Sequence, residues 1–198
     1  MTRPSMGTGW RQFREAVAGD LARFARVGGR RTPQRGFLLK AWLFLPGFRF
    51  VLTHRLQALI ATVPVVGPLV AKLYWARSCR RYGSEIAQIA RIGPGCYIPH
   101  PYAVVLGDCT LGRNVVILQS VTIGKRGDSA AHGPRIGDEV EIGAGAILLG
   151  AITIGDGARI GANSLVLIDV PAGAIAMGSP ARIVQPKPPA PEQIHERA

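Results

Sequence analysis

The sequence has few cysteines, and they follow no pattern that a disulfide framework or a metal site would use. Its 198 residues contain three, at Cys79, Cys96 and Cys109. An odd number does not complete a set of disulfides, and the spacing matches no zinc-binding motif. We therefore expect no bound metal and no disulfide, which fits a protein of the reducing cytoplasm.

Acidic residues are scarce in the first part of the chain. Residues 1–85 contain 15 Lys and Arg but three Asp and Glu, whereas residues 86–198 contain nine of each kind. The whole formal excess of +12 therefore lies in the first half, where it favours an anionic partner. The arginines are scattered and follow no nucleic-acid-binding motif, so we do not expect nucleic acid to be that partner.

The chain lacks an apolar run long enough to cross a membrane. The uncharged segment 56–71 is shorter than the roughly 18 to 20 residues of a spanning helix, and Pro64, Gly67 and Pro68 interrupt it. The N-terminus has no compact apolar stretch with a small-residue cleavage site, so we expect no signal peptide. These features predict a cytoplasmic protein.

Segment 37–52 combines large apolar residues with Lys40 and Arg49. It fits either a helical hairpin buried in the protein or an interfacial helix beside anionic lipid. Residues 1–84 are therefore expected to form a basic, apolar α-helical region.

Aliphatic residues recur at every sixth position in the second half of the chain. A helix would repeat at three and four residues, and a hairpin array would need two-residue turns, so neither explains a period of six. Short strands, three to a circuit, predict a parallel β-helix over residues 85–184, followed by a Pro-rich tail at 185–198. The inward positions are Ile86, Ile92, Ile98, Val105, Leu111, Ile117, Ile123, Ile136, Ile142, Leu148, Ile154, Ile160 and Val166.

Two further residue columns follow the same period. The residue directly after the aliphatic is glycine at seven positions, which predicts corners that need a permissive backbone; these are Gly93, Gly112, Gly124, Gly137, Gly143, Gly155 and Gly161. A second inward column of small or medium residues comprises Cys96, Cys109, Val115, Val121, Val140, Ala146, Ile152, Ala158 and Ser164. We expect the coil to need neighbouring copies for stability, with its two ends capped by the helical region and the Pro-rich tail.

The period is broken twice, and a histidine lies at each break. Segment 99–103 adds a residue to one repeat and contains His100 between two prolines, while segment 124–134 is a longer interruption that contains His132. In a solenoid the regular rungs form the scaffold, and extruded residues are those that can meet a ligand.

The motifs ILQSVTIG, IGAGAILLGAITIGDGARIGANSLVL and GSPARIV make the chain resemble the serine acetyltransferase family of hexapeptide-repeat acyltransferases. The variant TIGKRG is similar to relatives in exopolysaccharide biosynthesis, such as colanic acid acetyltransferases. The resemblance covers about residues 85–184. It implies a left-handed β-helix, a homotrimer or a dimer of trimers, and acetyl-coenzyme A as the donor.

The resemblance also assigns catalytic roles. His100 matches the family's general base, which removes the proton from the acceptor hydroxyl, and Glu85 matches the acid that orients this histidine. Imidazole suits such a task, and a carboxylate on its second nitrogen fixes the tautomer. His132 stands one residue before the family's second active-site histidine, so its role is either to orient the substrate or none at all.

Coenzyme A is expected to lie in a groove between neighbouring coils, where small residues admit its amide-like arm and cations bind its phosphates. The small residues are Gly124, Ala144 and Ala162, and the cations are Lys125, Arg126, Arg182 and Lys187. For each cation the alternative is a solvated surface charge.

Three charged residues that hold serine in the family are absent. Pro99 and Thr32 replace aspartates, and Ala131 or His132 replaces an arginine. We therefore expect a sugar hydroxyl of an exopolysaccharide or glycan intermediate as the acceptor, with peripheral contact of the basic region to the inner membrane face. Serine O-acetylation is the alternative. A zinc hydratase would need three histidines where the coil has two, and a non-catalytic scaffold would tolerate loss of His100.

Overall fold

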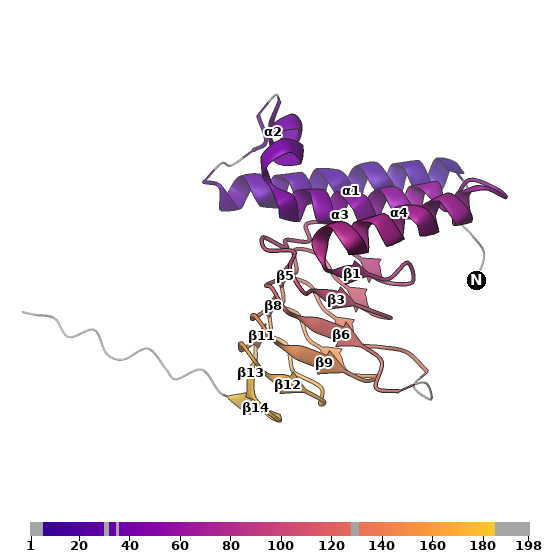
Figure 1. The fold of residues 1–198 in the computed structure, drawn as a ribbon. Coiled ribbons are helices and arrows are strands. Elements are labelled where there is room, and N and C mark those ends of the chain that lie inside the picture. Colours follow the sequence, from indigo (N-terminus) through magenta and orange to yellow (C-terminus); the bar gives the residue numbers. More distant parts are fainter. Residues whose placement is uncertain (1–5, 30–31, 35, 128–130, 185–198) are drawn as a thin grey trace, which may run out of the picture.

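A layer of helices lies across one end of a tapering β-coil (Figure 1). The computed structural model describes residues 6–29, 32–34, 36–127 and 131–184. Lys187 and the Pro-rich tail, which we expected to cap the coil, lie outside the described residues.

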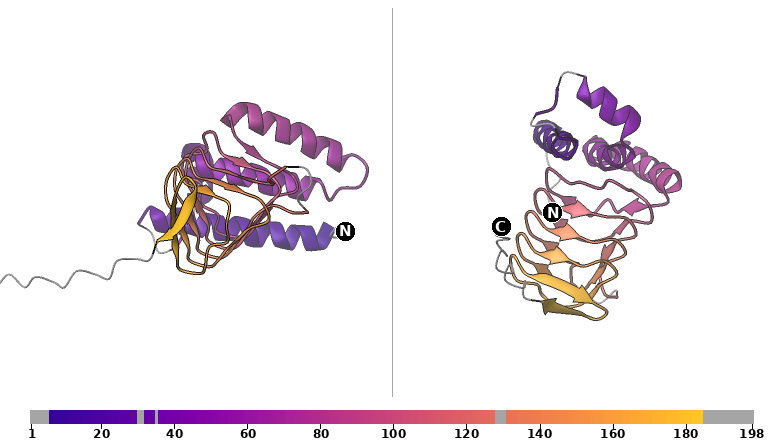
Figure 2. Two further views of the ribbon diagram at one scale, coloured as in Figure 1. Left: turned by 90° about the horizontal axis from the view of Figure 1, so that it is seen from below. Right: turned by 90° about the vertical axis from the view of Figure 1, so that its left-hand side faces the viewer.

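The helical layer contains α1 (Met6–Val27), α2 (Phe37–Phe44), α3 (Pro46–Ile60) and α4 (Gly67–Tyr82). Pro46 stands at the first turn of α3, where its missing N–H costs nothing, and Gly83, with φ of 57°, ends α4. Helix α3 lies between α1 and α4, and α2 sits above them on the side away from the coil (Figure 2). The predicted helical region is thus four helices. A hairpin buried in the protein, one of the two expectations for segment 37–52, is not what forms, because most of α2 is exposed and only Phe37 and Ala41 of it are buried.

The strands are two to four residues long and stack into three sheets that form the sides of a triangular prism. Sheet A has the order β1-β3-β6-β9-β12, sheet B the order β2-β4-β7-β10, and sheet C the order β5-β8-β11-β13-β14. All pairings are parallel except the last, between β13 and β14. The strands are β1 (Glu85–Ile86), β2 (Arg91–Ile92), β3 (Val105–Leu106), β4 (Thr110–Leu111), β5 (Val116–Ile117), β6 (Thr122–Gly124), β7 (Arg135–Ile136), β8 (Glu141–Ile142), β9 (Ile147–Leu149), β10 (Thr153–Ile154), β11 (Arg159–Ile160), β12 (Leu165–Val166), β13 (Ile175–Gly178) and β14 (Ala181–Val184).

The predicted inward positions form the core of the coil, with one exception. Val105 is 38% exposed, and its neighbour Leu106 is fully buried instead. The break before β3 adds two residues rather than one, so Leu106 is the residue that pairs with inward Ile86. Val105 pairs with Glu85 and faces outward with it, because alternate residues of a strand face opposite sides.

The second inward column is buried as expected, including Cys96 and Cys109. Burial raises the pKa of the Cys96 thiol and of the Cys109 thiol to about 12 in each case. Both cysteines therefore act as small core residues rather than as reactive thiols.

The glycines after the inward aliphatics serve a purpose other than the one we predicted. None has a positive φ. An added Cβ at Gly137 would lie 2.2 Å from Asp156 Oδ1, and one at Gly112 would lie 2.3 Å from Asp138 Oδ1. The same oxygens accept backbone hydrogen bonds from the preceding coil. Asp156 Oδ1 accepts the N–H of Asp138, and Asp138 Oδ1 accepts the N–H of Arg113, both at 2.7 Å. The glycines thus allow close approach of the next coil. The left-handed positions lie two residues further on, at Gly95, Asn114, Glu139, Gly145, Gly157 and Asn163.

A buried ion pair attaches the helical layer to the first coil. Arg55 on α3 donates from Nε to Asp20 on α1 at 3.1 Å, and both side chains are almost completely buried. The Asp20 carboxylate also accepts the backbone N–H groups of Gly95 and Cys96, while Arg55 donates to the carbonyl of Gly93 at 2.6 Å. Charge and hydrogen bonding are both satisfied, as a buried pair requires.

The other end of the coil is closed by an element that the repeat did not predict. Strands β13 and β14 form an antiparallel hairpin, and β13 continues sheet C by pairing with β11. Within the described residues, this hairpin rather than the tail ends the stack.

Candidate active site

Glu85 and His100 lie on adjacent coils at the edge of the prism where sheet C passes into sheet A. Glu85 begins β1, and its N–H donates to the carbonyl of Val104 at 2.7 Å. The neighbouring Ser84 hydroxyl donates to the carbonyl of Pro101 at 2.9 Å and accepts the Val104 N–H at 3.1 Å. These bonds hold the segment around His100 against the start of β1. The period of the repeat gave no signal for Ser84.

The His100 side chain is exposed on this edge rather than buried in the core. Pro101, which follows it, is buried, so the backbone carrying the imidazole is fixed on one side. Tyr102 beside it is 57% exposed, and the Glu85 carboxylate is half-buried. In the described part of the chain no hydrogen bond joins the Glu85 and His100 side chains. The edge thus presents a base and an acid to whatever covers it.

His132 lies on a different edge, where sheet A passes into sheet B. The loop that carries it leaves the coil after β6 and returns before β7, and in Figure 1 it projects from the ends of the sheet A strands. Its exposed ring has Nδ1 3.1 Å from the carbonyl of Gly133. Gly133 is buried where an added Cβ would collide with the carbonyl oxygen of Asp108. The loop is therefore anchored at its return.

The residues expected to bind coenzyme A are divided between these edges. Ala144 and Ala162 lie at corners on the His100 edge, where the Asn163 N–H donates to the Ala144 carbonyl at 2.8 Å. Gly124, Lys125 and Arg126 lie on the His132 edge. Lys125 there forms an ion pair with Asp108 at 3.1 Å. One copy of the chain therefore does not assemble the single groove that we expected, because the width of sheet A separates its parts.

Arg182 lies away from both groups, exposed on β14 at the far end of the coil. It pairs with Met177 through the backbone ladder of the terminal hairpin.

The outer face of sheet A lies between the two edges and is mostly apolar. In register its outward residues are Glu85, Val105, Thr122, Ile147 and Leu165. Those of sheet B are Arg91, Thr110, Arg135 and Thr153. Those of sheet C are Val116, Glu141, Arg159, Ile175 and Val184. Val105 and Ile147 remain 38% and 37% exposed, so an apolar strip lies open on sheet A.

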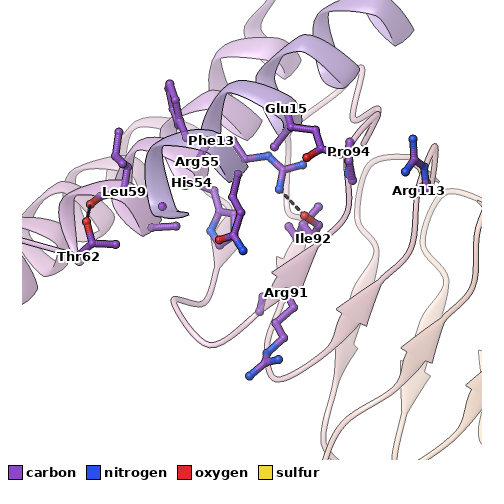
Figure 3. Close-up of a pocket in the computed structure, with 15 residues that line it drawn as sticks. Phe13, Glu15, His54, Arg55, Leu59, Thr62, Arg91, Ile92, Pro94 and Arg113 are labelled. Atoms are coloured by element: carbon purple, nitrogen blue, oxygen red, sulfur yellow. Dashed lines mark hydrogen bonds between the residues drawn. The ribbon is translucent and has the colours of Figure 1, made fainter. Parts of the chain in front are cut away.

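A cavity of about 530 Å³ lies at the junction of α1, α3 and the first coils. Figure 3 shows Arg91 and Arg113 on neighbouring coils at one side and Leu59 on α3 at the other. His54 lines it, and burial together with the Arg55 charge lowers the pKa of this histidine to about 3, so the ring is neutral. The cavity belongs to the attachment of the helices and lies apart from the His100 edge.

The described residues contain no cluster of three or more His, Cys, Asp and Glu side chains suited to a metal ion. No helix among them is long and apolar enough to cross a membrane.

Comparison with known sequences identifies the repeat and its relatives. Residues 133–167 match the family "Bacterial transferase hexapeptide (six repeats)". The serine acetyltransferase of Synechococcus elongatus is 36% identical over 168 residues, which are 83% of this chain and 67% of that protein. The serine acetyltransferase of Helicobacter pylori is 44% identical over 104 residues, 52% of this chain and 61% of that protein. The chain thus spans about two thirds of the length of these relatives.

Solved structures agree with the sequence relatives. Soybean serine acetyltransferase complexed with serine has a TM-score of 0.75 at 39% identity, covering 88% of this chain and 70% of that one. A serine acetyltransferase in complex with CoA has a TM-score of 0.74 at 30% identity, with the same coverage. The expected closeness to exopolysaccharide acetyltransferases finds no support here, because these relatives are serine acetyltransferases.

Proposed function

This chain belongs to the serine acetyltransferase family and is an acyltransferase, and we propose that it transfers the acetyl group of acetyl-coenzyme A to the hydroxyl of serine. The relatives favour this acceptor, the alternative in our sequence analysis, over the sugar that we first expected. The observation that carries the proposal is the placement of Glu85 and His100 on adjacent coils, which the Ser84 bonds to Pro101 and Val104 maintain.

In the proposed reaction His100 acts as the general base. Its free ring nitrogen takes the proton of the acceptor hydroxyl as that oxygen bonds to the thioester carbonyl carbon. Glu85 accepts a hydrogen bond from the other ring nitrogen, which keeps the imidazole in the tautomer that can receive a proton. When the carbon–sulfur bond breaks, His100 returns the proton to the departing thiolate. Acetylated acceptor and free coenzyme A result.

The co-substrate fits the residues of the His100 edge. Ala144 and Ala162 leave no large side chain along the corners that follow His100, so an extended amide-like arm can lie against the backbone there. Exposed cations for its phosphates stand on the other edge, at Lys125 and Arg126, and on the terminal hairpin at Arg182.

The complete site is proposed to form between copies in a homotrimer of left-handed coils. Two observations support this arrangement. The His100 edge and the His132 edge lie on opposite sides of sheet A, and the strip between them is apolar through Val105, Ile147 and Leu165. When unlike edges of neighbouring copies meet around a rotation axis, the ring closes and each site receives both.

A sugar hydroxyl remains the second candidate acceptor, favoured by one observation. Pro99, Thr32 and either Ala131 or His132 stand where the family has charged contacts to serine. An ammonium and a carboxylate bind poorly without charged partners.

An acceptor panel tests the proposed function. The full chain is given acetyl-coenzyme A with serine, or with a set of sugars, and the released thiol is measured. Thiol release with serine, at a higher kcat/KM than with any sugar, supports serine. Activity with sugars alone would assign the second candidate, and no release with either would overturn the proposal.

A further inference from the structure

A basic pocket is lined by residues of α2, α3 and α4. Its volume is about 330 Å³, and its charged groups are Arg49, Arg77 and Arg81, with no Asp or Glu in its lining. None of the three forms an ion pair within the described residues. The Nε of Arg49 is buried there without a hydrogen-bond partner. Three unneutralised guanidinium groups in one concave site are suited to an anion with several oxygens, such as a phosphate ester.

Half of the residues that line the basic pocket are aromatic or aliphatic. Trp42 comes from α2, Leu52 and Leu56 come from α3, and Tyr74 and Tyr82 come from α4. Arg77 and Arg81 are exposed, so an anion can reach their guanidinium groups from solvent. The mixed lining suits a ligand whose charged group is joined to an apolar part.

Exposed aliphatic and aromatic side chains lie on α2 and at α4, two of the three helices that line the basic pocket. On α4 they follow a helical stripe, and the stripe continues into Arg77. We call these residues the apolar rim: Leu38 (49% exposed), Leu39 (61%), Leu43 (46%) and Phe44 (70%) near or on α2, and Val66 (59%), Leu69 (63%), Val70 (46%) and Leu73 (62%) at α4. So much apolar surface beside a cationic site indicates a binding surface.

We propose that this surface docks on an anionic phospholipid membrane, with a lipid phosphate in the basic pocket and the apolar rim among the outer acyl carbons. Charge complementarity selects this occupant. Residues 1–85 carry 15 Lys and Arg against three Asp and Glu, so a second copy would bring arginines to arginines, whereas the surface of an anionic leaflet attracts them. The attachment is interfacial, since no described helix can span the bilayer. It holds whichever acceptor the enzyme uses.

Vesicle sedimentation of the full chain tests the docking. We expect binding to vesicles of phosphatidylglycerol and phosphatidylcholine, weaker binding as salt rises, and little binding to phosphatidylcholine alone. The double variant Arg77→Gln/Arg81→Gln should lower the partition coefficient about 25-fold, at about fivefold per lost charge.

A control variant of equal net charge separates binding at the basic pocket from general attraction between a basic protein and an anionic membrane. Arg113→Gln/Arg135→Gln, two exposed arginines of the coil, should change the partition coefficient less than about twofold. Equal losses in the two double variants would overturn the assigned surface. Absence of vesicle binding by the unaltered chain would overturn the proposal, even if isothermal titration showed that the chain binds inorganic phosphate.

The apolar rim gives a second, independent test. Leu39→Ser and Leu69→Ser alter side chains that are 61% and 63% exposed, so the fold should tolerate both. Each should weaken binding to the anionic vesicles about tenfold. If instead vesicle binding is unchanged while light scattering shows a smaller assembly, the rim is a contact between copies and the membrane proposal is wrong.

Discussion

The coil and the helical layer are built on opposite plans. In the coil each buried residue is repeated at the next rung, residues 86–184 carry seven charges of each sign, and corner bonds such as Asp138 to Arg113 recur. In the helical layer the packing does not repeat and the charge is strongly basic. Its attachment to the coil combines apolar packing, with Phe50 and Val51 in the core of the coil, and one buried ion pair, Asp20 and Arg55. The coil has many equivalent contacts, whereas the ion pair of the junction occurs once.

The largest expected effect is on the rate of acetyl transfer, at a residue whose replacement should leave the stability of the coil unchanged. His100→Ala should lower the rate of acetyl transfer by about 10² to 10⁴, the usual contribution of a positioned base. The melting temperature should stay unchanged, because the side chain is exposed. A thiol-release assay and a thermal melt on the same sample measure both quantities. A variant that keeps full activity would remove His100 from the reaction.

Asp20→Asn removes one partner of the buried ion pair between the two regions. It leaves Arg55 charged and buried without a carboxylate, which should cost about 3–5 kcal/mol of unfolding free energy. Denaturant titration measures the loss, and limited proteolysis should cut the helices first. Glu15→Gln, on an exposed position of the same helix, serves as the control and should change stability little. Equal stabilities would mean that the pair does not hold the layers together.

Gly137→Ala probes a single rung of the coil. The added methyl group would lie 2.2 Å from Asp156 Oδ1 and would displace the next corner, at about 1–3 kcal/mol. Gly124→Ala is the matched control for stability, since no atom lies within 4 Å of its added Cβ. Chemical denaturation of both variants distinguishes close packing from a general glycine effect, which would shift both equally.

The smallest expected effect concerns the coil's surface charges. Arg159 and Glu141 form an ion pair at 3.5 Å on adjacent rungs, but their side chains are 66% and 52% exposed. Arg159→Ala should therefore cost less than about 1 kcal/mol in the same titration. A loss as large as that of Asp20→Asn would contradict the contrast between exposed and buried pairs.

Prediction from the sequence succeeded where structure repeats and failed where it does not. The period of six located the core of the coil because every rung obeys the same pairing. It placed Val105 inward instead of Leu106, because the sequence does not show how many extra residues precede β3. It also attributed the corner glycines to backbone conformation, because the sequence does not show which atoms of the neighbouring coil lie beside each glycine.

The junction and the division of the site needed three-dimensional information. Asp20 and Arg55 are 35 residues apart in sequence and belong to no repeat, so nothing marks them as partners. The histidines were recognised at the two breaks, but the breaks alone do not say on which corner of the prism each emerges. Family resemblance proposed His100 and Glu85, and their roles stay predictions, while the relatives changed the preferred acceptor from a sugar to serine.

The closure of both ends of the coil bears on its solubility. Strands rich in isoleucine and valine, stacked in parallel register with open backbone at each end, have the composition and geometry on which fibrils grow. Here helices cover the first rung, and the reversed direction of β14 offers an incoming parallel strand the wrong hydrogen-bond pattern in sheet C. In sheet C the far end of the coil therefore does not offer the open parallel edge on which a fibril could grow.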